Sequence, residues 1–108
     1  MSGVSIESID TFQLRIPLDI WAPPPMFAGK PRTHVEAIYV RVKTNKGVTG
    51  WGEAFSNAGW QATCTAIKDI IAPRVTGKDP SNIAQIQADL HRGLYNTGRS
   101  GPVPFAIS

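Results

Sequence analysis

The residue types that perform catalysis are few in this chain, and they are scattered. A catalytic site needs a nucleophile beside a base, a pair of acids, or a cluster of metal ligands. Cys64 is the single cysteine, and its place on an apolar helical stripe favours a buried structural thiol over a nucleophile. His91 falls near the edge of a second stripe, which is typical of a surface or half-buried helix residue. We therefore predict no catalytic residue in this chain.

The acidic residues and the glycines do not form the spacings that metal or phosphate sites require. Glu36, Glu53 and Asp69 belong to different expected elements, so they make no ligand cluster. The segment 50–52, Gly-Trp-Gly, is glycine-rich. It lacks the following helix that would aim N–H groups at a phosphate. We predict neither a metal ligand nor a phosphate-binding loop.

Composition excludes several classes of function. The formal charge of +3 comes from eleven basic residues that are scattered singly, without a basic run or helix face, which argues against nucleic-acid binding. The hydrophobic content of 42% is typical of a globular protein. No apolar run approaches the ~20 residues that cross a bilayer, and the first ten residues do not resemble a signal peptide. A cytoplasmic location without membrane contact is therefore the default expectation.

The elements that would position a site are organised around a hairpin over residues 34–55. Its first half alternates apolar and polar residues, which predicts a strand with one buried face. Residues 44–47 supply a turn, in which Gly47 can take the positive φ of a G1 bulge. The return strand has only glycine and alanine on one face, which permits a bulge or the close approach of another backbone. The apolar face of the first half consists of Ile38, Val40 and Val42.

A strand over residues 4–16 and a long connection precede this hairpin. The strand is apolar at even positions, but Ser8 and Asp10 interrupt that pattern and predict a bulge or an exposed middle. Pro17 is expected to end the pairing. The connection, residues 18–33, contains three consecutive prolines and is longer than most loops of small domains, which favours a functional segment. Its apolar residues, Trp21, Met26 and Phe27, suit a lid over another surface.

Two amphipathic helices are expected after the hairpin. The first spans about 60–72 and ends at Pro73 and Gly77. The second begins at Asp79, an N-cap candidate, followed by Pro80. Three strands followed by helices predict an α+β fold, with a three-stranded antiparallel meander and a small helical bundle. The stripes consist of Cys64, Ile67, Ile70 and Ile71 in the first helix, and of Ile83, Ile86, Leu90 and Leu94 in the second.

The hairpin with its GWGEA ending, residues 50–54, resembles the N-terminal capping domain of the enolase superfamily, in its mandelate racemase and muconate-lactonizing branch. The Asp-Pro pair at 79–80 and the glycine- and proline-rich segment 98–104 also match, so the resemblance spans about residues 4–108. It implies that residues 1–108 are a capping domain, truncated at the start of the segment leading to a barrel. In that superfamily a modified TIM barrel carries the Mg²⁺ ligands and the base that abstracts a proton α to a carboxylate. The TIM barrel is absent from this chain, so the resemblance implies that Mg²⁺ binds the full-length enzyme and not this chain.

The resemblance also implies two loops that close over a small-molecule carboxylate substrate, at about residues 20–32 and 55–60. The meander is expected to bring them together at one edge of the sheet. Their apolar side chains would exclude water, and their cations would face the anion. Trp51 and Glu53 are expected to pack and to bond across the interface with the barrel. The expected capping residues are Trp21, Met26, Phe27, Arg32, His34, Phe55 and Trp60.

Two functional hypotheses from different classes follow. The resemblance implies the capping domain of a racemase, cycloisomerase or acid-sugar dehydratase, in a homo-oligomeric enzyme, with the chain alone inactive. The alternative is a stand-alone α+β binding or adaptor module that recognises a partner through the segment 21–27. A nucleic-acid binder is a distant third, for which salt-dependent DNA affinity is the test.

Overall fold

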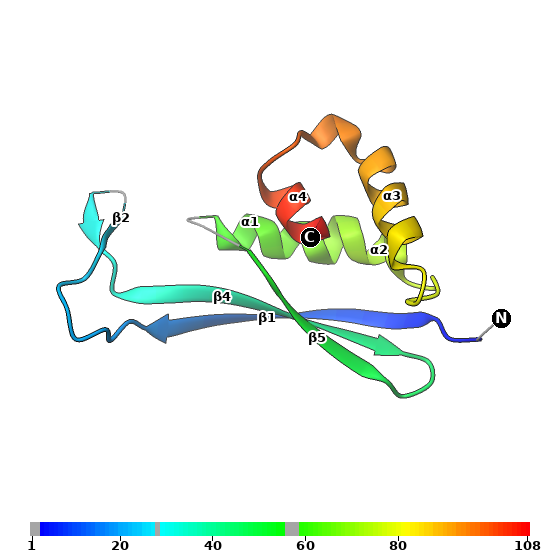
Figure 1. Cartoon of the computed structure of the whole chain (residues 1–108), viewed down its shortest axis with the longest axis horizontal. Helices are drawn as coiled ribbons and strands as arrows, with labels where there is room; N and C mark the ends of the chain where they lie inside the picture. The colour runs from blue at the N-terminus through cyan, green and yellow to red at the C-terminus, as the bar shows by residue number, and fades with distance from the viewer. Residues whose placement is uncertain (1–2, 28, 56–58) are drawn as a thin grey trace.

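The fold has two layers, a twisted antiparallel sheet and a group of helices that covers one of its faces (Figure 1). The computed structural model describes residues 3–27, 29–55 and 59–108. The sheet contains β1 (Ile6–Pro17), β4 (His34–Thr44) and β5 (Thr49–Ala54) in the order β1-β4-β5. The predicted three-stranded meander and the α+β class are thereby confirmed. No described helix is long and apolar enough to cross a membrane.

A bulge in β1 decides which of its side chains are buried. The register with β4 shifts between Ile6 and Ser8, as the interrupted pattern predicts. Ile6 is buried, and beyond the bulge Ile9 packs against the helices, so burial moves from even to odd positions. The apolar even positions therefore lie on the other face of the sheet. These residues are Phe12, Leu14 and Ile16, with exposed fractions of 37%, 40% and 44%.

The hairpin of β4 and β5 forms as its sequence predicts. Gly47 has φ of +80°, and its N–H donates to the Thr44 carbonyl at 3.2 Å, which closes the turn. Ile38 is completely buried beneath the helices. It belongs to a core cluster with Ala54, Cys64 and Ile67, against which Val40 also packs.

The first helical rod consists of α1 (Trp60–Thr65), the π-helical η1 (Ala66–Ile71) and α2 (Ala72–Val75). It continues to Val75, three residues beyond the expected end, although Pro73 lies inside it. The Ala72 N–H donates to the Ile67 carbonyl five residues back. This wider turn just before Pro73 fits a residue that has no N–H for the regular helical bond. Cys64, Ile67 and Ile71 are buried, which confirms the predicted stripe.

The second helix, α3 (Ile83–Gly93), begins later than the sequence predicts. Asp79 does not cap it, because its carboxylate accepts hydrogen bonds from the backbone N–H and the hydroxyl of Ser81, at 2.9 and 2.7 Å. This local turn delays the helix by three residues. A short 3₁₀ turn, η2 (Tyr95–Thr97), and α4 (Pro102–Ile107) follow. A second core cluster joins Ile6, Ile71, Val75, Leu90, Leu94 and Ile107.

The connection between β1 and β4 contains regular structure that the sequence does not predict. The short strands β2 (Met26–Phe27) and β3 (Lys30–Pro31) pair with each other in a separate two-stranded sheet. The Arg32 N–H donates to the Pro25 carbonyl at 2.8 Å, which closes this small hairpin. The connection is therefore a folded excursion and not a simple loop.

Candidate functional site

The ends of β1 and β4 project beyond the rest of the sheet as a two-stranded arm. Pro17 pairs with His34 at the tip of the arm, whereas β5 ends at Ala54, opposite Ile38. The arm is therefore roughly 13 Å long, at about 3.3 Å per residue. It carries the β2–β3 hairpin, which rises on the same side of the sheet as α1 (Figure 1).

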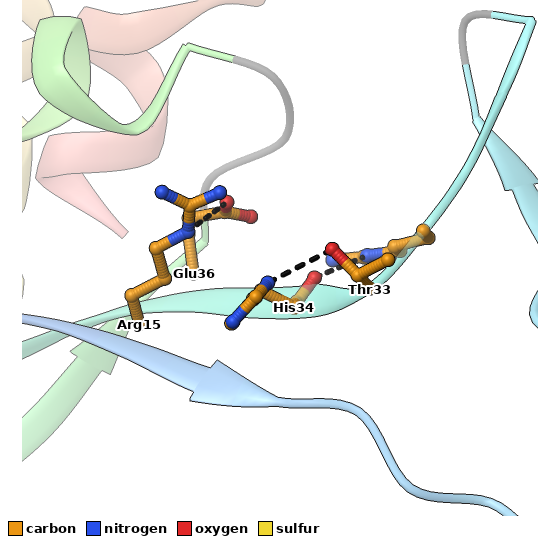
Figure 2. A network of polar contacts seen from close by, with 5 residues as sticks. Arg15, Thr33, His34 and Glu36 are labelled. Carbon is orange, nitrogen blue, oxygen red and sulfur yellow. Dashed lines mark hydrogen bonds and ion pairs between the residues drawn. The ribbon is translucent and has the colours of Figure 1, made fainter.

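The arm carries a cluster of polar side chains, which we call the arm cluster: Arg15, Arg32, Thr33, His34 and Glu36. Figure 2 shows Arg15, Thr33, His34 and Glu36 of this cluster. Arg15 Nε lies 3.7 Å from Glu36 Oε1, across the β1–β4 pair. Thr33 Oγ1 and His34 Nδ1 lie 2.9 Å apart, with the donor set by the histidine tautomer. Arg32 Nε donates to the His34 carbonyl at 3.2 Å. These contacts connect the two strands of the arm and hold the base of the hairpin.

The arm cluster lies on the face of the sheet that the helices cover elsewhere. Glu36 and Ile38 are two residues apart on β4, so they share a face, and Ile38 lies under the helices. The Arg15 side chain is 63% exposed, so its ion pair contributes little to stability and leaves the guanidinium accessible. With two arginines and one glutamate, the arm cluster has excess positive charge, which suits a carboxylate ligand.

Sequence reasoning named Arg32 and His34 but missed Arg15 and Glu36. Their contact depends on the register between β1 and β4, which pairs two residues that are 21 positions apart in the sequence. The signal that would find them is the opposite charge of directly paired residues, which is favourable on antiparallel strands. It becomes usable only once the register is known.

Three of the apolar residues expected to cover a substrate lie on the connection between β1 and β4, which includes β2. Trp21 is 97% exposed and has φ of +56°, a left-handed conformation that is rare for a large side chain. Met26, in β2, is 65% exposed. For Phe27 the structure describes the backbone, within β2, while its side chain lies outside the described part. The capping role of all three stays a prediction.

The second expected loop begins at the end of β5. Phe55 is 57% exposed, and its ring meets Phe105 of α4 edge to face, with centroids 4.9 Å apart. Trp60 is half-buried at the start of α1, where it packs against the core cluster around Ile38. Residues 56–58 of this loop lie outside the described residues. The fold therefore shows the two ends of the loop, and its capping role also stays a prediction.

Two of the cavities border the sheet or the connection that includes the hairpin. The larger, about 540 Å³, lies between β5 and the helices α3 and α4, with a mainly apolar lining that includes Gly50 and Gly52. A Cβ added to either glycine meets no described atom within 4 Å, so this glycine face borders a cavity and not a closely packed backbone. The smaller, about 390 Å³, lies at the base of the hairpin, where Trp21 and Arg32 line it. Its lining places Arg32 together with the exposed Trp21, with Asp19 as a nearby acid, so it can bind a small polar ligand. A cavity of about 380 Å³ at the end of α3 similarly combines Arg99 with the exposed Tyr95, but it lies away from the arm.

The described residues offer groups that can bind an anion. No three of their His, Cys, Asp or Glu side chains are grouped closely enough to hold a metal ion. The donor set at the arm, two guanidinium groups and an imidazole beside one carboxylate, does not fit Mg²⁺, which prefers oxygen ligands. The site is suited to binding, orientation and exclusion of water.

The left-handed conformation of Trp21 leads to a stability prediction. We expect Trp21→Gly to raise the free energy of unfolding by about 0.5–1 kcal/mol, because glycine adopts this φ without a clash and the exposed ring buries little surface. Urea denaturation followed by circular dichroism measures the change. Trp21→Ala, which keeps the unfavourable φ, is the matched control and should leave stability nearly unchanged. Equal effects of the two variants would contradict the prediction.

Comparison with known proteins shows which family of domains the chain matches. The sequence profile of the N-terminal domain of the mandelate racemase / muconate lactonizing enzyme family matches residues 11–106. A D-galactonate dehydratase family member from Streptomyces bingchenggensis is 35% identical over 66 residues, which are 61% of this chain and 16% of that protein. An N-succinyl-L-Arg/Lys racemase from Bacillus cereus is 24% identical over 97 residues, covering 85% of this chain and 26% of the relative.

Solved structures share the fold over nearly the whole chain. The crystal structure of L-talarate/galactarate dehydratase from Salmonella typhimurium, liganded with Mg and L-lyxarohydroxamate, superposes with a TM-score of 0.82 at 30% identity. The match covers 99% of this chain and 28% of that one. This chain therefore spans between a sixth and a third of the length of these similar proteins.

Proposed function

Because this chain belongs to the mandelate racemase / muconate lactonizing enzyme family, which it matches through the N-terminal domain, we propose that it caps the active site of a Mg²⁺-dependent enzyme. The enzyme abstracts a proton α to a carboxylate, and racemization, cycloisomerization or dehydration follows. Among these we favour dehydration of acid sugars, on the similarity to the galactonate and galactarate dehydratases. The observation that carries the proposal is the family match over residues 11–106.

In this proposal residues 1–108 form the capping domain, and a barrel domain supplies the catalytic base and the metal ligands. Mg²⁺, when bound by ligands of the barrel, would supply positive charge where negative charge develops as the proton leaves. The absence of a ligand group among the described residues of this chain is compatible with that division of labour. We further propose that the enzyme is cytoplasmic and homo-oligomeric.

The residues of this chain bind and enclose the substrate. Arg32, at the base of the hairpin, directs positive charge into the smaller cavity and pairs with a substrate carboxylate. Trp21 and Met26 cover the substrate and exclude water, which strengthens the electrostatic interactions beneath them. His34 anchors the hairpin through its carbonyl, which accepts from Arg32.

The test is a chimera in which this chain replaces the equivalent region of the Salmonella typhimurium dehydratase. Mg²⁺-dependent dehydration of a panel of aldarates and aldonates is measured for the chimera, for this chain alone and for the barrel without a capping domain. We expect turnover by the chimera and none by the chain alone. Turnover by the chain alone, or a chimera no more active than the uncapped barrel, would contradict the proposal.

The exposure of Trp21 and Met26 also favours a second candidate, a binding module that docks a partner protein through this segment. The chimera distinguishes the two. A capping role predicts that substitutions at Trp21 change the KM of the chimera for its substrate. A docking role predicts that they leave the kinetics unchanged.

A further inference from the structure

One face of the sheet has no helix over it among the described residues, and we call it the open face. It is formed by the even positions of β1 beyond the bulge and the odd positions of β4 and β5, which the register places side by side. The helices all lie on the other side (Figure 1). Large apolar side chains are nevertheless concentrated here: Phe12, Leu14 and Ile16, with Trp51 at 62% exposed.

The centre of the open face is a preformed stack of side chains. The Arg41 guanidinium lies 4.9 Å from the centroid of the Phe12 ring and 5.7 Å from that of Trp51, whose rings are 5.5 Å apart. Asp10 Oδ2 accepts hydrogen bonds from Nε and Nη2 of Arg41, at 3.2 and 3.0 Å. Arginine and tryptophan are enriched among the residues that dominate binding interfaces. Here the ring contacts order both side chains, and Asp10 neutralises the charge of Arg41.

Two exposed charges of opposite sign flank this stack. Lys43 faces Thr49 and Glu53 faces Tyr39, while the Arg41–Trp51 pair lies midway between these two pairs. Neither Lys43 nor Glu53 forms an ion pair with another described residue. A two-fold axis through the Arg41–Trp51 pair would place Lys43 of one copy against Glu53 of a second copy, twice by symmetry. The open face is thus complementary to itself.

From this arrangement we infer that the open face is the interface of a homodimer of this chain. The β2–β3 hairpin rises on the opposite side of the sheet, so the dimer leaves the candidate site accessible (Figure 1). The dimer also provides a partner for Glu53 on the open face. The expectation from the sequence is that Glu53 bonds across an interface with the barrel. The β1–β4 pair measures about 36 Å by about 10 Å and the shorter β5 adds about 20 Å by about 5 Å, so the face is roughly 450 Å² in projection. Interfaces at this low end of the size range are mostly weak and transient, so we expect a dissociation constant in the micromolar range.

This inference rests on the proposed homo-oligomeric state and names the surface through which two copies associate. Its test does not require enzymatic activity. Analytical ultracentrifugation of the chain, from about 5 to about 200 μM, brackets a micromolar dissociation constant. We expect a concentration-dependent dimer. Lys43→Glu and Glu53→Lys should each weaken it at least about tenfold, because each sets like charges opposite each other at two symmetric contacts. The double variant K43E/E53K restores both contacts and should dimerise as the original chain does.

Two controls separate this interface from loss of folding and from other sticky surfaces. Circular dichroism checks that every variant is folded, and Tyr95→Lys, a change at an 81% exposed aromatic outside the sheet, should leave the dimer unchanged. A chain that stays monomeric throughout, or single and double charge variants that dimerise equally, would overturn the inference. Failure of the chimera would leave the dimer standing, and a monomeric chain would leave the capping role standing.

Discussion

Replacing Ile38 with alanine is expected to lower the free energy of unfolding of this chain by about 3–4 kcal/mol. Ile38 is completely buried, and it joins β4 to the helical layer through Cys64 and Ile67. The substitution removes buried methylene groups and leaves a cavity that the two packed layers cannot fill, which costs about 2–5 kcal/mol. Small domains are stable by only about 5–15 kcal/mol, so this is a large part of the total. Urea denaturation followed by circular dichroism measures it.

The matched control for this prediction is Ile83→Ala, the same chemical change at the exposed start of α3. Ile83 is 68% exposed, so its truncation removes little buried surface, and we expect a loss below about 1 kcal/mol. A loss at Ile38 no larger than at Ile83 would show that the two layers do not pack as described.

Replacing Arg32 with alanine in the chimera is expected to raise the KM for an acid-sugar substrate by about 10- to 100-fold. A hydrogen bond to a charged group contributes about 1.5–3 kcal/mol, and Arg32 lines the cavity at the base of the hairpin. The measurement is steady-state kinetics of the chimera with the aldarates and aldonates of the same substrate panel. Because Arg32 also donates to the His34 carbonyl, the melting temperature is recorded alongside to detect a structural loss.

The control for Arg32 is Lys30→Ala, which removes one positive charge two residues away, on β3. Lys30 is exposed and does not line the smaller cavity. A general effect of charge would raise the KM in both variants alike, whereas a specific contact affects Arg32 alone. Arg32→Lys should recover part of the affinity, because lysine keeps the charge without the two-pronged geometry of the guanidinium.

The local elements could be predicted because their signals lie within short stretches of sequence. Alternation in residues 38–42 indicated a strand with one buried face, and the turn needed only the residues around Gly47. The stripe from Cys64 to Ile71 indicated a helix whatever it packs against. The start of α3 was missed because Asp79 has two local uses, a helix cap or a turn, and its bonds to Ser81 select the turn.

The sequence by itself determined the three long strands, the two main helical stripes and the resemblance to a family, because periodicity and turn chemistry act over a few residues. It did not reveal the β2–β3 hairpin or the start of α3. Only the tertiary structure decided which face the side chains of β1 occupy and which residues of distant strands meet. The bulge after Ile6 moves burial on β1 to odd positions, so Phe12 lies on the open face and Arg15 lies beside Glu36. A shift of one residue in strand pairing reverses both faces, and contacts between distant segments set that shift.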